Sequence, residues 1–252
     1  MLRRVIDALL PQSCRLCGLP SGAHAVCAGC RADLPRLPRA HCPVCALPQP
    51  HSQVCGRCLR HPPAFDRTRA LWTYDAPADR LIHDLKFHAC LPLARFFAAQ
   101  LVAHLAEERA AERTDEGVTA PAAQAAAHAP YRPDLLLAMP LHPNRLRERG
   151  FNQSVEIARA LARMQGWRFD PCALVRLHDT PPQRELAWAK RRRNVRGAFA
   201  CTADVAGLHV AVVDDVLTTG ASLHELAKVL KAAGAASVST VVLARTPRLR
   251  GR

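Results

Sequence analysis

Eight of the 11 cysteines in this 252-residue chain form Cys-x-x-Cys pairs near its start. The four pairs are Cys14/Cys17, Cys27/Cys30, Cys42/Cys45 and Cys55/Cys58. Each of the last two pairs lies 28 positions after one of the first two, and the flanking residues repeat as well: CRLCGLP corresponds to CPVCALP, and CAGC to CGRC. The segment is therefore an internal duplication, with a first repeat at residues 14–30 and a second repeat at residues 42–58.

The spacing of the cysteines points to bound metal. A two-residue gap lets both thiolates of a pair reach one ion, and two pairs complete a tetrahedral set of four cysteines with no open position, as in structural zinc sites. Residues 12–63 are rich in proline and poor in large apolar side chains, so metal binding would have to supply their folding energy. We therefore predict a double zinc ribbon over residues 1–63 that holds two structural Zn²⁺ ions.

Other uses of the cysteines fit less well. A redox motif or ordinary buried cysteines would explain one Cys-x-x-Cys pair, but not four pairs in a duplicated frame. Sequential pairing, with one zinc per repeat, is the simplest assignment, and a cross-braced arrangement fits the same spacing. The three remaining cysteines, predicted to be small core residues, are Cys90, Cys172 and Cys201.

The composition excludes several classes of protein. With 49% hydrophobic and 22% charged residues, the chain is neither disordered throughout nor collagen-like, and it has no apolar run of the roughly 18 to 20 residues that a membrane span needs. The first residues include two arginines and an apolar stretch, but Asp7 interrupts that stretch and no small-residue cleavage site follows. We therefore expect a cytoplasmic protein, where thiols stay reduced. The formal net charge of +14 favours a ligand that carries phosphate, such as nucleic acid.

From about residue 66 onward, strand-like and helix-like patterns alternate, which predicts an α/β fold with a parallel sheet covered on both faces. The predicted strands are residues 70–74, 134–139, 173–177, 209–213 and 237–244. The predicted helices are residues 77–87, 91–108, 151–166 (with Asn152 as N-cap) and 221–233 (stopped by Gly234). Residues 109–133 are rich in alanine and lack apolar periodicity, so we expect a mobile surface insertion there.

The most specific stretch is VAVVDDVLTTGAS at residues 210–222. Its apolar residues end a buried strand, and Asp214 and Asp215 follow at the carboxyl end, where ligands bind in open α/β sheets. The TTGAS turn (residues 218–222) then opens a helix whose free amides, hydroxyls and small side chains suit an anion. Alternatively, Ser222 caps the helix and the aspartates only end the strand. The length of the whole string favours a ligand site.

This string resembles the phosphoribosyl pyrophosphate (PRPP) signature of type I phosphoribosyltransferases. The resemblance implies that Asp214 and Asp215 hold the ribose 2- and 3-hydroxyls, directly or through Mg²⁺. It also implies that a cradle for the 5-phosphate is formed by Thr218, Thr219, Gly220, Ala221 and Ser222.

Two basic stretches lie where such enzymes bind the rest of PRPP. Residues 140–154 follow the predicted strand 134–139, at the place of the pyrophosphate loop, and the planar guanidinium groups in them suit phosphate oxygens. These arginines are Arg145, Arg147 and Arg149. Residues 180–199 correspond to a flexible loop that closes over the substrate, with candidate residues Gln183, Arg191 and Asn194. Each stretch is also consistent with a solvated basic surface, and the second with a nucleic-acid patch.

Taken in order, the cysteine pairs, LKF (residues 85–87), RLRERGFNQS, QRELAWAKRRRNVRGAF and VVDDVLTTGAS resemble the ComF family of competence-associated, phosphoribosyltransferase-like proteins. The resemblance covers nearly the whole chain. It leaves out the Ala-rich insertion and an Arg-rich tail with Arg245, Arg248, Arg250 and Arg252. It implies a type I phosphoribosyltransferase-like domain of parallel sheet and flanking helices over residues 64–252, and an association with DNA uptake in natural transformation.

The resemblance implies an enzyme that transfers the phosphoribosyl group of PRPP to a nitrogenous acceptor such as a nucleobase. Asp214, Asp215, Arg145 and Arg149 would then be catalytic, because the transition state carries positive charge on the ring and negative charge on the leaving pyrophosphate. Lys86 could reach the pyrophosphate, but the pattern favours an ordinary exposed helix lysine. The alternative is a non-catalytic accessory protein that senses PRPP or binds single-stranded DNA. Its partners would be a competence helicase or other uptake proteins.

Overall fold

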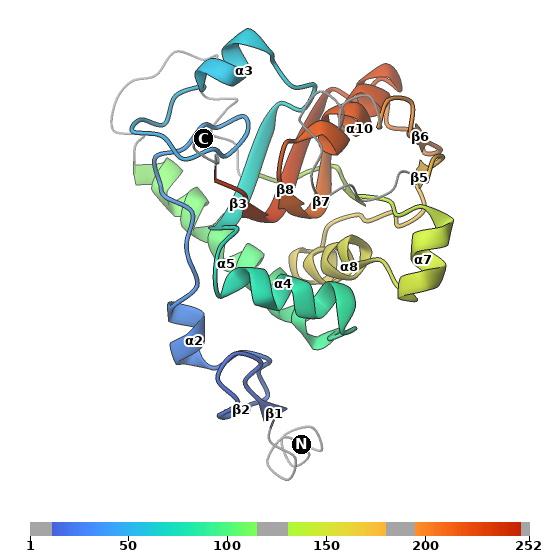
Figure 1. The fold of residues 1–252 in the computed structure, drawn as a ribbon. Helices are drawn as coiled ribbons and strands as arrows, with labels where there is room; N and C mark the ends of the chain where they lie inside the picture. The colour runs from blue at the N-terminus through green and yellow to red at the C-terminus, as the bar shows by residue number, and fades with distance from the viewer. Residues whose placement is uncertain (1–11, 115–130, 180–194, 248–252) are drawn as a thin grey trace, which may run out of the picture.

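Four strands form a parallel sheet in the order β3-β8-β7-β4 (Figure 1). Every neighbouring pair in it is parallel, which confirms the predicted sheet. The structure is a computed structural model, and it describes residues 12–114, 131–179 and 195–247. The strands of the sheet are β3 (Arg67–Thr73), β4 (Leu135–Ala138), β7 (His209–Leu217) and β8 (Ser237–Arg245).

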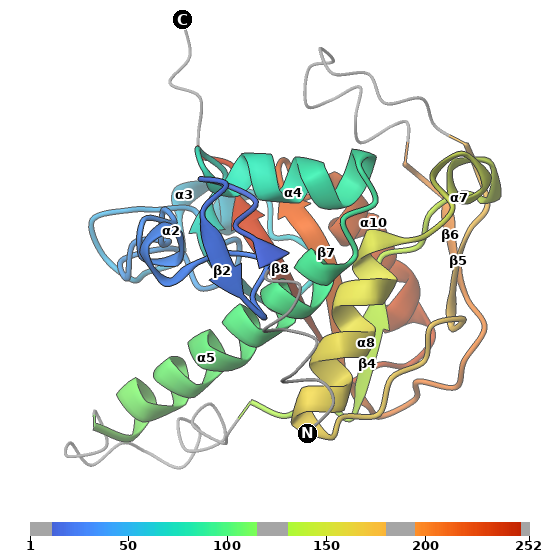
Figure 2. The same ribbon diagram turned by 90° about the horizontal axis from the view of Figure 1, so that it is seen from below.

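Helices cover both faces of this sheet (Figures 1 and 2). They are α4 (Ala78–Phe87), α5 (Pro92–Thr114) and α8 (Gln153–Gln165) on one face and α10 (Ala221–Ala232) on the other. In β7, Ala211 and Val213 belong to the core under α4, α5 and α8. Val210 and Val212 belong to the core under α10. Successive strand residues point to opposite faces, so a strand buried on both faces has one continuous apolar run.

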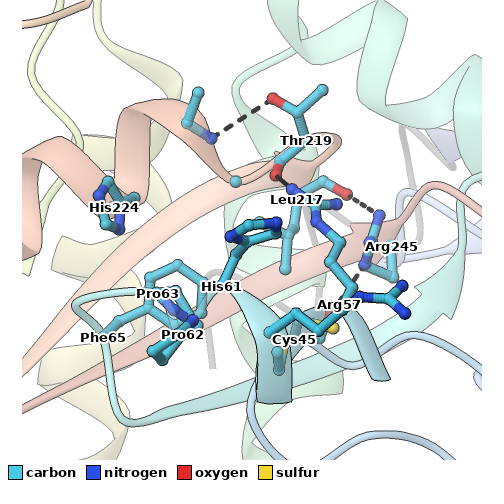
Figure 3. Close-up of a pocket in the computed structure, with 14 residues that line it drawn as sticks. Cys45, Arg57, His61, Pro62, Pro63, Phe65, Leu217, Thr219, His224 and Arg245 are labelled. Carbon is cyan, nitrogen blue, oxygen red and sulfur yellow. Dashed lines mark hydrogen bonds between the residues drawn. The ribbon is translucent and has the colours of Figure 1, made fainter. Parts of the chain in front are cut away.

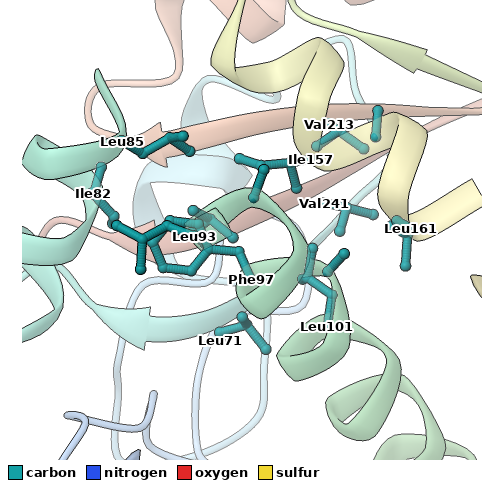
Figure 4. Close-up of a cluster of buried hydrophobic side chains, with 14 of the residues drawn as sticks. Leu71, Ile82, Leu85, Leu93, Phe97, Leu101, Ile157, Leu161, Val213 and Val241 are labelled. Atoms are coloured by element: carbon teal, nitrogen blue, oxygen red, sulfur yellow. The ribbon is translucent and has the colours of Figure 1, made fainter. Parts of the chain in front are cut away.

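The larger core lies between the sheet and the three helices α4, α5 and α8 (Figure 4). Leu85 of α4, Phe97 of α5 and Ile157 of α8 are almost completely buried there. They pack with Val213 and Val241 from the two central strands of the sheet. This packing fixes the carboxyl end of α4 and the start of α8 beside the carboxyl ends of the strands.

Helix ends follow the signals in the sequence. The side-chain oxygen of Asn152 accepts hydrogen bonds from the backbone N–H groups of Ser154 and Val155, so α8 begins at the predicted cap. α10 ends before Gly234, whose φ of +91° lies in the left-handed region that favours glycine.

Two predicted segments differ in the structure. The strand predicted at residues 173–177 is β5 (Leu174–Arg176), but it pairs antiparallel with β6 (Phe199–Cys201) in a separate sheet. Only Leu174 of β5 is buried, so this short strand lacks the two apolar faces that a central strand needs. α5 continues to Thr114, which makes residues 109–114 of the predicted insertion helical. Residues 115–130 of that insertion lie outside the described residues.

The lone cysteines share no single environment. Cys90 is buried and Cys201 is half-buried, but Cys172 is exposed, so the prediction of a core position is wrong for Cys172. It lies in a turn before β5, where its backbone N–H donates to the Asp170 carboxylate. A turn of this kind runs over the surface because its polar backbone needs solvent or side-chain partners.

The longest helix in the described part of the chain is α5, with 23 residues. Neither it nor any other described helix combines the length and the apolar character that a bilayer-spanning segment requires.

The two cysteine repeats lie apart from each other in Figure 1. The first, with β1 (Gln12–Ser13), β2 (Pro20–Gly22) and α2 (Ala28–Ala32), projects from the body of the protein; the second, with α3 (Gly56–Arg60), lies over β3 and β8. Thr68 of β3 fastens the second repeat to the sheet: its N–H donates to the carbonyl of Pro43 and its hydroxyl to the carbonyl of Val44.

A buried cation joins β3 to α5. Arg69 is 5% exposed, and its Nε donates to the Glu108 carboxylate at 2.8 Å. The Tyr131 ring stacks 3.6 Å from its guanidinium carbon, and the Tyr131 hydroxyl is 2.8 Å from the hydroxyl of Ser239. This cluster ties the chain on both sides of residues 115–130 to the sheet.

Arg69→Ala is expected to lower the free energy of unfolding by about 3 kcal/mol, because it removes the buried guanidinium that pairs with the Glu108 carboxylate and stacks on the Tyr131 ring. Urea denaturation measures this loss. The matched control is Arg36→Ala, which breaks the neighbouring pair with Glu107 on the same helix, where both side chains are more than half exposed. That change should cost less than about 1 kcal/mol. Equal losses in the two variants would show that the Arg69 cluster is not a stabilising element.

Candidate functional site

The eight paired cysteines form two clusters of four, and in each cluster the sulfur atoms lie within 4.8 Å of one another. The first cluster is Cys14, Cys17, Cys27 and Cys30, and the second is Cys42, Cys45, Cys55 and Cys58. Pairing is therefore sequential, with one cluster in each repeat, and the cross-braced alternative is wrong.

The two clusters share their local geometry and fit structural zinc. In the first repeat the N–H of Cys27 donates to the sulfur of Cys14 at 3.4 Å, and the equivalent Cys55 and Cys42 have the same distance. Burial raises the pKa of the Cys55 thiol, but hydrogen bonds from the Cys58 backbone and the other thiols lower it to about 7, whereas burial leaves the pKa values of Cys45 and Cys58 raised. Four convergent thiols with N–H donors beside them suit Zn²⁺ and leave no open coordination position.

Asp214 and Asp215 lie just past the end of the sheet's edge strand. β4 pairs with β7 only as far as Ala138 opposite Val213, so the next two residues of β7 extend beyond β4. β7 itself continues beside β8 as far as Leu217. The aspartates therefore lie within the strand, whereas the sequence places them after it. The correction leaves them at the carboxyl edge of the sheet, where α/β folds bind ligands.

Asp215 faces α4 and α8, because it continues the row of Ala211 and Val213 along β7. Its Oδ2 accepts hydrogen bonds from Nζ of Lys86 at 2.9 Å and from Nε2 of Gln153 at 2.7 Å. Only 21% of the Lys86 side chain is exposed, so the prediction of an ordinary exposed lysine at position 86 is wrong. Burial lowers the pKa of Lys86, but the Asp215 carboxylate more than offsets this and leaves it raised, so the ammonium stays charged.

Asp214 is the less well compensated of the two carboxylates. Its Oδ1 accepts hydrogen bonds from the Ser154 hydroxyl at 3.2 Å and from the N–H of Asp215 at 2.9 Å. Burial and then the charge of Asp215 raise the pKa of Asp214 to about 7, although Lys86 opposes the shift. Two carboxylates beside one ammonium attract a hard cation such as Mg²⁺ or the hydroxyls of a ligand.

Asp214→Asn is expected to stabilise the protein by about 1–3 kcal/mol at pH 8 and by much less at pH 5. The folded-state pKa of Asp214 is raised from 3.8 to about 7, so ionising this group costs stability. That cost is absent below the unfolded-state pKa and is complete above pH 7. Thermal unfolding of both proteins at pH 5 and pH 8 measures the difference. A variant less stable than the wild type at pH 8 would contradict this interpretation.

Gly220 sets the shape of the TTGAS turn. It precedes α10 with φ +79°, and a Cβ there would lie 3.4 Å from Leu217 Cδ1, so glycine is the residue that fits at no steric cost. α10 starts at Ala221, which places Ser222 inside the helix and makes the alternative of Ser222 as a cap wrong. The first N–H groups of α10 are thus available to an anion.

The other residues of the turn offer hydroxyls near these amides. Thr218 is exposed, and Thr219 and Ser222 are half-buried. Thr219 Oγ1 accepts a hydrogen bond from the N–H of Ala221 at 3.3 Å, so only part of the helix start is satisfied by the turn itself. The turn therefore combines accessible hydroxyls with an exposed helix start.

The arginine stretch is a short helix, α7 (Pro143–Arg149), rather than the predicted loop. His142 caps its start, Pro143 occupies its first turn, and Gly150 ends it with φ +79°. Proline inside the start and glycine just past the end are helix signals that the sequence contains.

Arg149 is the arginine of α7 nearest to the carboxylates. It donates to Oε1 of Gln153 at 2.5 Å, and Gln153 in turn donates to Asp215. Its guanidinium carbon lies 5.2 Å from the centre of the Phe87 ring. Burial lowers the pKa of Arg149 from its ordinary value, and the Asp215 charge opposes this. A continuous polar chain thus runs from α7 through α8 to β7.

Arg145 and Arg149 share a cavity of about 210 Å³ between α4 and α7, which Lys86 and Glu148 also line. The lining holds three cations and one carboxylate; Lys86 also pairs with Asp215, and Arg145 lies 4.0 Å from the Asp179 carboxylate. The excess of cations in the lining suits an anionic group. Arg147 does not line it and instead donates to the side chain of Asn144. The structure therefore brings two of the three predicted arginines together with Lys86 and leaves Arg147 apart.

Some predicted residues fall elsewhere. The candidate loop residues Gln183, Arg191 and Asn194 lie outside the described residues, as do residues 248–252 of the basic tail. Arg245, placed in that tail from its sequence, is the last residue of β8 and is 4% exposed. It is buried because its guanidinium donates hydrogen bonds to backbone carbonyls.

Gln153 and Ser154 are site residues that the sequence analysis does not identify, and Lys86 is one for which it favours an exposed position over a role at the pyrophosphate. Gln153 and Ser154 follow the Asn152 cap, in the first turn of a helix that starts after a strand end, and polar residues at such a position are a usable signal. Lys86 lies in the last turn of α4, a helix whose other face is apolar, and nothing in that pattern shows which loop or strand its ammonium contacts.

The chain has two closed four-cysteine clusters, and a parallel sheet follows them. The sheet carries paired aspartates and an anion-binding type of turn at one edge. Together these features define the class of zinc-ribbon proteins with a phosphoribosyltransferase-type fold. Residues 5–59 match the double zinc ribbon domain family, and residues 179–252 match the phosphoribosyl transferase domain family.

Relatives extend this match to nearly the whole chain. DNA utilization protein YhgH of Escherichia coli (strain K12) is 35% identical over 243 residues, covering 94% of this chain and 98% of that protein. Competence protein F of Haemophilus influenzae is 30% identical over 229 residues, covering 88% and 91%. The chain belongs to the ComF family. Hypoxanthine phosphoribosyltransferase from Trypanosoma cruzi is 15% identical, over 63% of this chain and 69% of that one, with a TM-score of 0.33, which is a weak likeness.

Proposed function

We propose that the protein binds PRPP together with Mg²⁺ and transfers its phosphoribosyl group to a nitrogenous acceptor, in support of DNA uptake or utilization. One observation carries the proposal: a polar site at one edge of the sheet, where the Asp214–Asp215 pair is continuous with the TTGAS turn on one side and bonded to Lys86 of the cationic cavity on the other. PRPP carries the matching groups, which are a ribose diol, a 5-phosphate and a pyrophosphate.

Each part of the ligand has a counterpart in this arrangement. The carboxylates of Asp214 and Asp215 accept hydrogen bonds from the ribose hydroxyls. The amides and hydroxyls of the TTGAS turn bind the 5-phosphate. The cavity lined by Lys86, Arg145 and Arg149 binds the pyrophosphate. Gln153 accepts a hydrogen bond from Arg149 and donates one to Asp215, so it fixes the position of the cavity arginine relative to the carboxylates. Such positioning is the main contribution a protein makes to group transfer.

The charges of the site favour departure of pyrophosphate. When the C1–oxygen bond breaks, positive charge develops on the ribose ring beside Asp214 and Asp215, and negative charge develops on the leaving oxygen beside Arg149 and Lys86. A bound Mg²⁺ would supply further neutralisation of the pyrophosphate. The acceptor nitrogen then forms the new bond to C1 with its own lone pair and releases its N–H proton to water or to the departing pyrophosphate, so the step requires orientation rather than a strong base.

A second candidate is a non-catalytic accessory protein that senses PRPP or binds single-stranded DNA. The relatives named for competence and DNA utilization and the net charge of +14 favour it. In either role we place the protein in the cytoplasm, where its thiols stay reduced, with a competence helicase or other uptake proteins as partners.

Pyrophosphate release from PRPP, screened across nucleobases with and without single-stranded DNA, separates the two candidates. If the protein is an enzyme, pyrophosphate should be released with at least one acceptor. A protein that binds PRPP but releases no pyrophosphate with any acceptor would contradict transfer and support the accessory role.

A further inference from the structure

The second cysteine repeat is hydrogen-bonded directly to the TTGAS turn (Figure 3). Arg245 donates through Nε to the carbonyl of Cys45 at 2.8 Å. Its Nη1 lies 2.9 Å from the Leu217 carbonyl and 2.7 Å from the Thr218 carbonyl. Arg57, between the last two cysteines of the second cluster, donates to the carbonyl of Thr219 at 2.7 Å. Two guanidinium groups therefore donate hydrogen bonds to three consecutive carbonyls: that of Leu217 at the end of β7, and those of Thr218 and Thr219 in the turn.

These bonds determine where the amides of the turn point. A trans peptide unit is planar, with its C=O and the following N–H on opposite sides. Carbonyls of Leu217, Thr218 and Thr219 held toward the ribbon therefore direct the next three N–H groups, those of Thr218, Thr219 and Gly220, away from it. These N–H groups belong to the proposed 5-phosphate cradle. Both donors are charged, which makes such hydrogen bonds stronger than neutral ones.

The second cluster is suited to anchor this arrangement and the first is not. All four cysteines of the second cluster are buried, whereas in the first only Cys14 is buried. Within the described chain, the hydrogen bonds of residues 12–34 stay inside that segment. The second repeat also bonds to β3 through Thr68 and to β8 through Arg245. Metal at the second site would thus hold α3 and the Cys45 carbonyl against the turn.

We propose that the second four-cysteine site positions the TTGAS turn for its ligand, with Arg57 and Arg245 as positioning residues, and that the first four-cysteine site does not. The identity of the ligand as PRPP rests on the proposed function. The link from the second metal site through Arg57 and Arg245 to the turn rests on the hydrogen bonds alone. Beside these contacts, a cavity of about 200 Å³ lies between the second repeat and the turn. The hydrogen bonds of Arg57 and Arg245 therefore connect the two where other side chains do not fill the space.

The test uses hydrogen exchange of residues 214–224 in the full zinc-loaded chain, followed by mass spectrometry, and the PRPP affinity measured by calorimetry. Arg57→Gln is expected to speed exchange of this segment and to weaken PRPP binding, each by about threefold to tenfold. Arg57→Lys, which keeps a charged donor, should restore most of both. The control is Arg60→Gln, an exposed arginine on the same short helix. Arg60→Gln should change neither the exchange of residues 214–224 nor the PRPP affinity, and exchange in α8 should be the same in all these variants.

The metal sites are compared with Cys30→Ser and Cys58→Ser, which are equivalent positions in the two repeats. Cys58→Ser is expected to speed exchange in residues 214–224 and Cys30→Ser to leave it unchanged. Equal effects of the two serine variants, or an Arg57→Gln variant with wild-type exchange and affinity, would overturn the proposal. A wild-type protein that binds no PRPP but whose exchange responds to Arg57→Gln would instead refute the ligand assignment and keep the link.

Discussion

Replacing Asp214 and Asp215 together by asparagine is expected to weaken PRPP binding on the order of 100-fold, the effect of losing two charge-assisted hydrogen-bonding groups. Asn keeps the size of both side chains and removes the negative charge that would attract Mg²⁺ and accept the ribose hydroxyls. It also leaves Lys86 without its carboxylate partner, which makes the site still less suited to a cation. Calorimetric titration of PRPP in the presence of Mg²⁺ measures the loss.

Thermal unfolding of the double variant separates lost binding from lost folding, because Asp215→Asn removes the partner of Lys86. Asp214→Asn alone should stabilise the protein at pH 8, since its raised pKa shows that ionising Asp214 is costly. The matched control is the double variant Asp33→Asn with Asp204→Asn, which makes the same charge change at two exposed positions and should keep wild-type affinity. Wild-type PRPP affinity in the Asp214–Asp215 variant would refute the site.

Removal of zinc is expected to have the largest effect on stability. Structural zinc contributes about 10–16 kcal/mol in isolated zinc-finger peptides, more than any single substitution in this chain would. The apolar side chains in the second cluster's core are few: besides its four cysteines, Leu47 is buried there. Without metal, residues 12–63 should lose their structure. Metal analysis should find two zinc ions per chain, and chelation should remove the protection of both repeats from hydrogen exchange.

The sheet behind the ribbons provides the internal control for chelation. Most of the buried residues around α8 belong to the sheet and its helices rather than to the cysteine repeats, so exchange in α8 should change far less than exchange in residues 12–63 when zinc is removed. A purified protein without zinc, yet with protected cysteine repeats, would contradict the assignment of the two cysteine clusters as zinc sites.

The sequence predicts the parts of this protein that depend on local pattern. The continuous apolar run of β7 indicates a strand buried on both faces, and the Asn152 cap marks the start of α8 within a residue. The cysteine spacing identifies both metal clusters because the duplicated frame repeats along with it. In these cases the cause lies within a short stretch of chain.

Contacts between distant segments could not be predicted in this way. Lys86 looks like a surface lysine until α4 is packed against β7 and its ammonium meets Asp215. Arg245 looks like part of a basic tail, but backbone carbonyls from three segments accept its hydrogen bonds and allow its burial. Apart from Thr246, which follows Arg245 directly in the chain, the partners of both side chains are more than 25 residues away. α7 is different: Pro143 inside its start and Gly150 just past its end are local signals that predict a helix from the sequence alone.

Titration of the wild-type protein with PRPP, with and without Mg²⁺, tests the central claim most directly. We predict saturable binding at one site per chain that requires Mg²⁺ and is lost in the Asp214→Asn, Asp215→Asn variant. Absence of binding in the zinc-loaded protein at millimolar PRPP and Mg²⁺, or binding that the double variant retains, would contradict it.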